Sequence, residues 1–113
     1  MRVLLDENIP HRFRRLLPSH EVFTIDYLGW KGKQNGELMA AMKVEKFNAL
    51  VTYDRALSSQ QNLQAAGVGV IVVVIHPKQF QRLRELAPDI QRTLDFLQPG
   101  QVVFIPASAP KPR

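Results

Sequence analysis

Short apolar runs rich in β-branched residues alternate along the chain with segments whose apolar residues recur at helical spacing. The three clearest runs cover residues 2–5, 49–53 and 68–75, and each is short enough for a buried strand. Weaker strand patterns cover residues 20–25 and 101–105. This alternation is typical of βα units around a mostly parallel sheet, so the pattern predicts an α/β fold.

The segments between the runs have the spacing and the punctuation of helices. Asn8 is predicted to cap a first helix that carries Pro10 near its first turn and stops at Pro18. A second helix is predicted to open at Asn35, which is also its predicted cap. The remaining predicted helices cover residues 58–65, stopped by Gly67, and residues 79–86 and 88–97, which are separated at Pro88.

The chain of 113 residues has the length of one domain, and we assign that domain to residues 1–106 with a frayed tail at 107–113. There is no cysteine, which excludes a disulfide scaffold, a thiolate zinc site and a cysteine nucleophile. An acid at position 6 argues against a signal peptide, and the longest apolar run is too short to span a bilayer. We therefore expect a soluble, cytoplasmic protein with no membrane association.

The formal net charge is +5 and the pI is about 10.0. Such a balance favours polyanionic partners such as RNA, DNA or an acidic protein. Solvated basic faces without a partner would give the same composition, and the charge alone leaves both interpretations open.

Two aspartates follow directly after predicted strands. Asp6 comes after residues 2–5, and Asp54 comes after residues 49–53. In a parallel sheet the carboxyl ends lie on one edge, and neighbouring strands there are only about 5 Å apart. Carboxylates that close repel each other unless a proton or a cation lies between them. Glu37, in the first turn of its predicted helix, is a candidate third acid, and the three together suit Mg²⁺ or Mn²⁺.

Each acid also has a purely structural interpretation. An Asp after a strand often forms an Asx turn or caps a helix, and a Glu in the first turn is favoured by the helix dipole. Glu7 is better explained as a solvated neighbour of Asp6 than as a metal ligand.

Three stretches of this sequence carry a family resemblance. They are Leu4-Leu5-Asp6-Glu7-Asn8-Ile9-Pro10, the segment 29–38 around Trp30 and Glu37, and the segment 50–57 around Asp54 with its continuation at 60–63. Together they resemble PIN-like domain proteins related to VapC-type toxins and the Mut7-C domain. The resemblance spans about residues 3–75, with a weaker echo at 99–105.

The resemblance implies a three-layer α/β/α sandwich around a mostly parallel sheet of four to five strands. It implies an endoribonuclease that depends on Mg²⁺ or Mn²⁺, commonly the toxin of a toxin–antitoxin pair, with RNA, an antitoxin protein and a second copy of the chain as partners. Asp6 matches the first acid, Glu37 the second and Asp54 the third. In a nuclease of this kind, the expected substrate-binding residues are Arg55, Lys31, Lys33 and Asn62.

One position departs from the family pattern. Many PIN-like proteins carry a fourth acid two residues after the third, and here that position is Ala56. A weaker or single-metal site is one consequence. A non-catalytic module that binds nucleic acid or an antitoxin is the alternative. Phospho-acceptor regulation at Asp54 fits less well, because residues 68–75 are followed by His76-Pro77-Lys78 and the order of the motifs differs.

Overall fold

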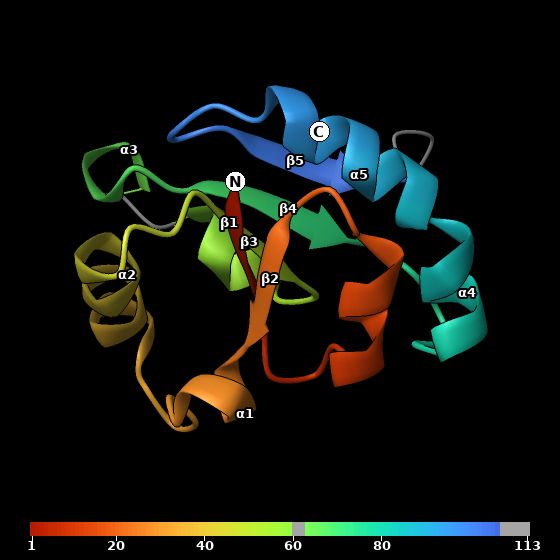
Figure 1. The fold of residues 1–113 in the computed structure, drawn as a ribbon, viewed down its shortest axis with the longest axis horizontal. Coiled ribbons are helices and arrows are strands. Elements are labelled where there is room, and N and C mark those ends of the chain that lie inside the picture. Colours follow the sequence, from red (N-terminus) through yellow and green to blue (C-terminus); the bar gives the residue numbers. More distant parts are fainter. Residues whose placement is uncertain (60–62, 107–113) are drawn as a thin grey trace.

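A five-stranded, all-parallel sheet forms the centre of the molecule (Figure 1). The structure is a computed structural model that describes residues 1–59 and 63–106. Each predicted strand is present within two residues of its predicted bounds. The strands are β1 (Arg2–Leu5), β2 (Glu21–Thr24), β3 (Ala49–Thr52), β4 (Gly69–Val73) and β5 (Val102–Ile105).

The sheet is buried on both faces, because alternate residues of its central strands enter two separate cores. In β1, Val3 and Leu5 belong to one core and Leu4 to the other. In β3, Val51 joins the first core and Leu50 the second. This period of two is the side-chain alternation of a β-strand, and continuous apolar runs are typical of parallel strands covered on both sides.

Helices complete a layer on each face of the sheet. The core that contains Val3 is closed by the 3₁₀ helix η1 (His11–Leu16) and by α4 (Phe80–Glu85) and α5 (Ala87–Phe96). The other core is closed by α1 (Ile25–Leu28), α2 (Asn35–Val44), the 3₁₀ helix η2 (Arg55–Ser59) and α3 (Leu63–Ala66). Figure 1 shows α2 and α3 on one side of the sheet and α4 and α5 on the other. The predicted α/β/α sandwich is therefore confirmed.

Three helix predictions need correction. Asn8 does not cap the first helix, because the Ile9 N–H donates to the Asp6 carbonyl over 3.0 Å and η1 begins only after an extended Pro10. Gln34 rather than Asn35 occupies the N-cap of α2.

The helix predicted over residues 58–65 also needs correction in its described part, because residues 58 and 59 end the 3₁₀ helix η2 and only residues 63–65 lie in an α-helix, α3. Residues 60–62 and the tail predicted to fray at 107–113 lie outside the described residues.

Other helix signals are confirmed. Gly67 follows α3 with φ = 74°, the left-handed conformation that glycine adopts without strain. Pro88 lies in the first turn of α5, where its missing N–H costs no hydrogen bond, and α4 ends just before it. The short α1 was not predicted, although Thr24 caps it and Gly29 ends it in a left-handed conformation.

The strand order β2-β1-β3-β4-β5 places the reversal of the sheet between β1 and β3. The chain leaves β1 toward β2 and then crosses to the opposite side of β1, where Leu5 pairs with Val51. Ligands of open α/β sheets bind at such a reversal, at the carboxyl ends of the strands. Within the described residues, no helix is long and apolar enough to cross a membrane.

Candidate active site

A pocket of about 400 Å³ opens where β1 and β3 end. Its polar lining comes from the segments that follow these two strands, from the loop before α2 and from the loop before α4. The residues that bear on its chemistry are Asp6, Glu7, Asn8, Trp30, Lys33, Asn35, Tyr53, Asp54, Arg55 and Lys78. The predicted convergence of Asp6 and Asp54 on one edge of the sheet is thus present in the structure.

Asp6 is held by three hydrogen bonds. Its backbone N–H donates to the Val51 carbonyl over 2.9 Å, which extends the β1–β3 pairing by one residue. Its Oδ1 accepts from the Glu7 N–H at 2.8 Å, and its Oδ2 accepts from the Thr52 hydroxyl at 2.5 Å. The carboxylate is therefore positioned from both sides before any ligand arrives.

Asp54 is exposed, and its backbone is tied to the same threonine. The Asp54 N–H donates to Thr52 Oγ1 over 2.9 Å, and Asp54 Oδ1 accepts from the Ala56 N–H at 2.8 Å. The second of these bonds forms the Asx turn that starts η2, so the structural role considered for Asp54 is real. Asp54 Oδ2 has no hydrogen-bond partner among residues 1–59 and 63–106 and can serve a ligand.

Thr52 is the site residue that the sequence analysis missed. Its side chain is fully buried, donates to Asp6 Oδ2 and accepts from the Asp54 N–H. One hydroxyl thus couples the first acid to the backbone of the other. The available signal was a threonine at the end of an otherwise apolar strand, directly before the Tyr53-Asp54 pair.

Cations line the wall of the pocket. Lys33 and Arg55 were predicted as substrate-binding residues, and both lie in the lining. Lys78 was not predicted; its Nζ lies 5.3 Å from the centroid of the Tyr53 ring. Burial raises the pKa of the half-buried Tyr53 phenol above its ordinary value, so this ring stays neutral across the physiological range.

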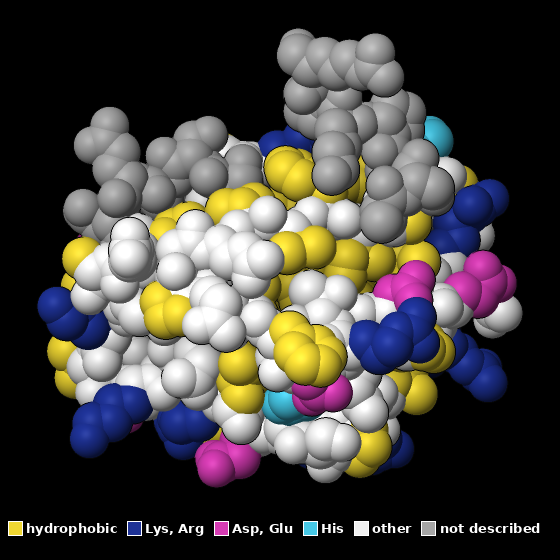
Figure 2. Space-filling model, turned by 90° about the horizontal axis from the view of Figure 1, so that it is seen from above, with side chains coloured by type: hydrophobic (Ala, Val, Ile, Leu, Met, Phe, Trp, Pro, Cys, Tyr) yellow, Lys and Arg dark blue, Asp and Glu magenta, His cyan; other side chains and the backbone are white. Residues whose placement is uncertain are grey.

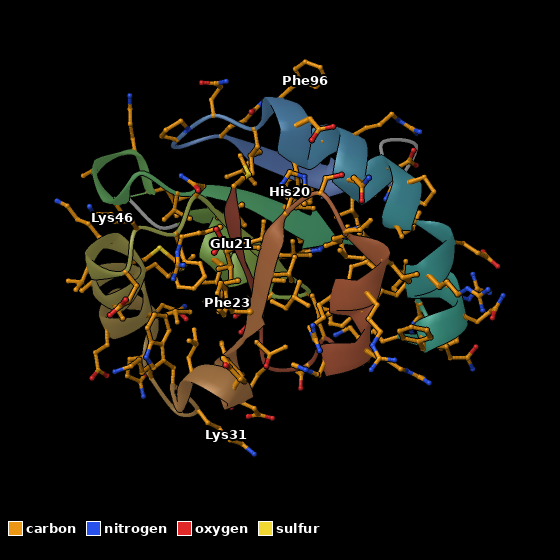
Figure 3. All side chains as sticks on the ribbon, viewed as in Figure 1. His20, Glu21, Phe23, Lys31, Lys46 and Phe96 are labelled. Carbon is orange, nitrogen blue, oxygen red and sulfur yellow. The ribbon has the colours of Figure 1, made fainter. Side chains whose placement is uncertain are left out.

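One of the two other predicted contacts is not found at the pocket. Lys31 is exposed, is absent from the lining, and points away from the body of the protein beyond α1 in Figure 3. Asn62 lies outside the described residues.

Glu37 has a structural task at the start of α2. Its Oε1 accepts from the Gln34 N–H over 3.2 Å, and the Gln34 side chain in turn accepts from the Glu37 N–H, so the two form a capping box. Glu37 is absent from the pocket lining. In the part of the chain that the structure describes, no group of three or more His, Cys, Asp or Glu residues is arranged to hold a metal ion. The structure brings Asp6 and Asp54 to one pocket but does not add Glu37 to them.

The donors in the pocket nevertheless fit a hard cation. The described residues of the lining offer carboxylate and amide oxygens and include no histidine or cysteine. Mg²⁺ commonly binds through one or two carboxylates and keeps several waters and substrate phosphate oxygens. Asp6 and Asp54 would hold such an ion, and the groups around them would leave room for its water shell.

A scan against protein-family models and searches of curated proteins and of solved structures gave no significant match. The function of the pocket is therefore inferred from its own geometry and from the three sequence motifs.

Proposed function

We propose that this protein is an endoribonuclease that depends on Mg²⁺ or Mn²⁺ and that cleaves RNA at the pocket between β1 and β3. One observation carries the proposal. Asp6 and Asp54 follow adjacent parallel strands, line the same pocket and are linked through the hydroxyl of Thr52. The resemblance to PIN-like toxins adds an antitoxin protein as the expected regulatory partner and a second copy of the chain as another.

The proposed roles follow from the charges around the pocket. Asp6 and Asp54 bind the cation, which when bound activates a water and offsets charge on the leaving oxygen. Lys33, Arg55 and Lys78 line the same pocket and supply positive charge for the phosphodiester. Thr52 is a positioning residue, since it touches the Asp6 carboxylate and not the substrate.

A second candidate is a non-catalytic module that binds nucleic acid or an antitoxin. Two observations favour it. Ala56 occupies the position at which many PIN-like proteins carry a fourth acid, and Glu37 forms a capping box with Gln34. Such a module would bind RNA without taking up metal.

Cleavage of a fluorescent RNA by purified protein in Mn²⁺ distinguishes the two candidates. We expect Asp6→Asn and Asp54→Asn each to lower the single-turnover rate by about 100-fold or more, since each removes a charged ligand. Glu45→Gln at the end of α2 is the matched control and should cleave like the wild type. Cleavage that survives in both aspartate variants refutes the assignment, and RNA binding with neither cleavage nor metal uptake favours the module.

A further inference from the structure

Six exposed cations concentrate on η1 and on the segment that leads into and forms α4. They are Arg12, Arg14, Arg15, Lys78, Arg82 and Arg84. Outside these six, the chain has nine Lys and Arg residues against ten Asp and Glu residues. The whole excess of positive charge therefore lies on this surface, which we call the η1–α4 surface.

The two elements of the η1–α4 surface lie side by side. The guanidinium of Arg12 lies 3.8 Å from the centroid of the Phe80 ring, across the junction between η1 and α4. Beneath it, Phe13 of η1 and Leu83 of α4 belong to the same core. Figure 3 shows nitrogen-tipped side chains projecting from both elements on this side of the sheet.

The cations on this surface are not neutralised by neighbouring acids. None of the six takes part in an ion pair among the described residues. The only acid on either helix is Glu85 at the end of α4. Six unpaired positive charges repel one another, and a polyanion relieves that repulsion when it binds.

Two of the arginines are already oriented. Arg12 stacks on Phe80, an arrangement that leaves the edge of a guanidinium open for hydrogen bonds. Arg14 donates from Nε to His11 Nε2 over 2.8 Å, which leaves its two terminal nitrogens for a ligand. Less side-chain entropy is lost when such pre-oriented groups bind a phosphate.

The η1–α4 surface continues into the candidate active site. Lys78 belongs to both, because it lines the pocket with Asp6 and Asp54 and precedes Arg82 of α4 by four residues. Figure 2 shows the molecule from above, and on this face the Lys and Arg side chains lie mainly toward the periphery.

We propose that the η1–α4 surface binds the phosphate backbone of the RNA strand whose cleaved phosphate enters the pocket. This role rests on the proposed function, although the binding itself requires no cleavage. An acidic protein is the less favoured partner, since protein interfaces need an apolar centre. Of the exposed large apolar residues of the described chain, Tyr27 borders Arg14, whereas Met1, Val44 and Phe96 belong to other elements.

The test measures RNA binding separately from catalysis. The affinity of a fluorescent oligouridine is followed by anisotropy in EDTA between 50 and 200 mM NaCl, a range over which phosphate contacts show strong salt dependence. The variant is Arg14→Gln/Arg82→Gln, and the control is Lys43→Gln/Lys46→Gln. The control pair lies at the far end of α2, and Figure 3 shows Lys46 on the opposite side of the molecule. Melting curves verify that both variants are folded.

We expect the Arg14/Arg82 variant to bind about tenfold more weakly and the salt slope to fall by about 1.4, or about 0.7 for each lost contact with a single strand. The control should keep the wild-type slope. An unchanged slope in the Arg14/Arg82 variant, an equal loss in the control, or binding of polyglutamate in place of RNA would overturn the assignment. Asp6→Asn should still bind RNA, so a failure of cleavage alone concerns the proposed catalysis and not this surface.

Discussion

The Thr52 hydroxyl donates to Asp6 Oδ2 over 2.5 Å from a fully buried position at the end of β3. The same oxygen accepts from the Asp54 N–H. Because both partners are fixed to adjacent parallel strands, the two aspartates are set relative to each other by the sheet. The geometry of the candidate metal site therefore depends on one side chain that itself faces neither solvent nor substrate.

Replacing Thr52 tests this dependence. Thr52→Val keeps the shape but leaves the Asp54 N–H and an Asp6 oxygen without their partner, so we expect a loss of about 1–3 kcal/mol in the free energy of unfolding. Cleavage should fall about 10- to 100-fold, as is usual when the support of a metal ligand is removed. Thr52→Ser retains the hydroxyl and should retain most of the activity. Urea unfolding and the cleavage assay measure the two effects, and equal activity of the Val and Ser variants would contradict this role.

Variants of Glu37 distinguish a capping role of this side chain from a catalytic one. Glu37→Gln keeps an acceptor for the Gln34 N–H, so we expect nearly wild-type stability and cleavage within about twofold. Glu37→Ala removes the acceptor and should cost about 0.5–2 kcal/mol of stability. Thermal unfolding and single-turnover cleavage test both variants. A large loss of cleavage in the Gln variant at unchanged stability would instead identify Glu37 as a metal ligand.

Tyr53 gives a pH dependence with a definite sign. Burial raises the pKa of its phenol above the ordinary value of 10.0, so the folded state holds the proton more tightly than the unfolded state. The stabilisation that comes from the protonated Tyr53 phenol is complete below pH 10 and is lost as the pH rises through the pKa of the folded state.

Tyr53→Phe should therefore lose less stability than the wild type between about pH 10 and 12. Urea unfolding across this range measures the difference, in which the titration of lysines common to both proteins cancels. Parallel stability curves for the two proteins would argue against the predicted effect of burial.

Gly69 tests the packing of β4 against the end of α5. A Cβ at this position would lie 2.5 Å from Leu97 Cγ and 2.8 Å from the Gln98 carbonyl oxygen. We expect Gly69→Ala to destabilise the protein by about 1–3 kcal/mol, because the tight contact forces a backbone or side-chain shift. Gly36→Ala is the matched control: its Cβ meets nothing within 4 Å in α2, and it should be neutral or stabilising by up to about 1 kcal/mol. Chemical unfolding of both variants decides the point.

The central strands β1, β3 and β4 were predictable because each is built mainly from a continuous apolar run, which is typical of strands buried on both faces. The edge strands β2 and β5 are less buried and gave weaker patterns. Asp6 and Asp54 were predictable for a related reason, since the carboxyl ends of neighbouring parallel strands share an edge. Thr52 was not, because a single polar residue in a strand does not reveal its partner across 46 residues. For Glu37 the sequence predicted the position in the first turn of α2 correctly. It could not predict whether the side chain points into the pocket or accepts from the Gln34 N–H, because that depends on side-chain geometry.

Lys78 and the η1–α4 surface were visible in the sequence only as separate basic groups. Arg12 and Phe80 are distant along the chain, and the contact between them is created by the packing of η1 and α4 on the same face of the sheet. A charge pattern that is read along the chain cannot show which cations meet in space.

The most direct measurement is calorimetric titration of the purified protein with Mn²⁺ in the absence of RNA. We predict one saturable site that is lost in Asp6→Asn and in Asp54→Asn and is retained in Glu37→Gln. No binding by the wild-type protein, or binding that both aspartate variants keep, would contradict a divalent-cation site at the ends of β1 and β3.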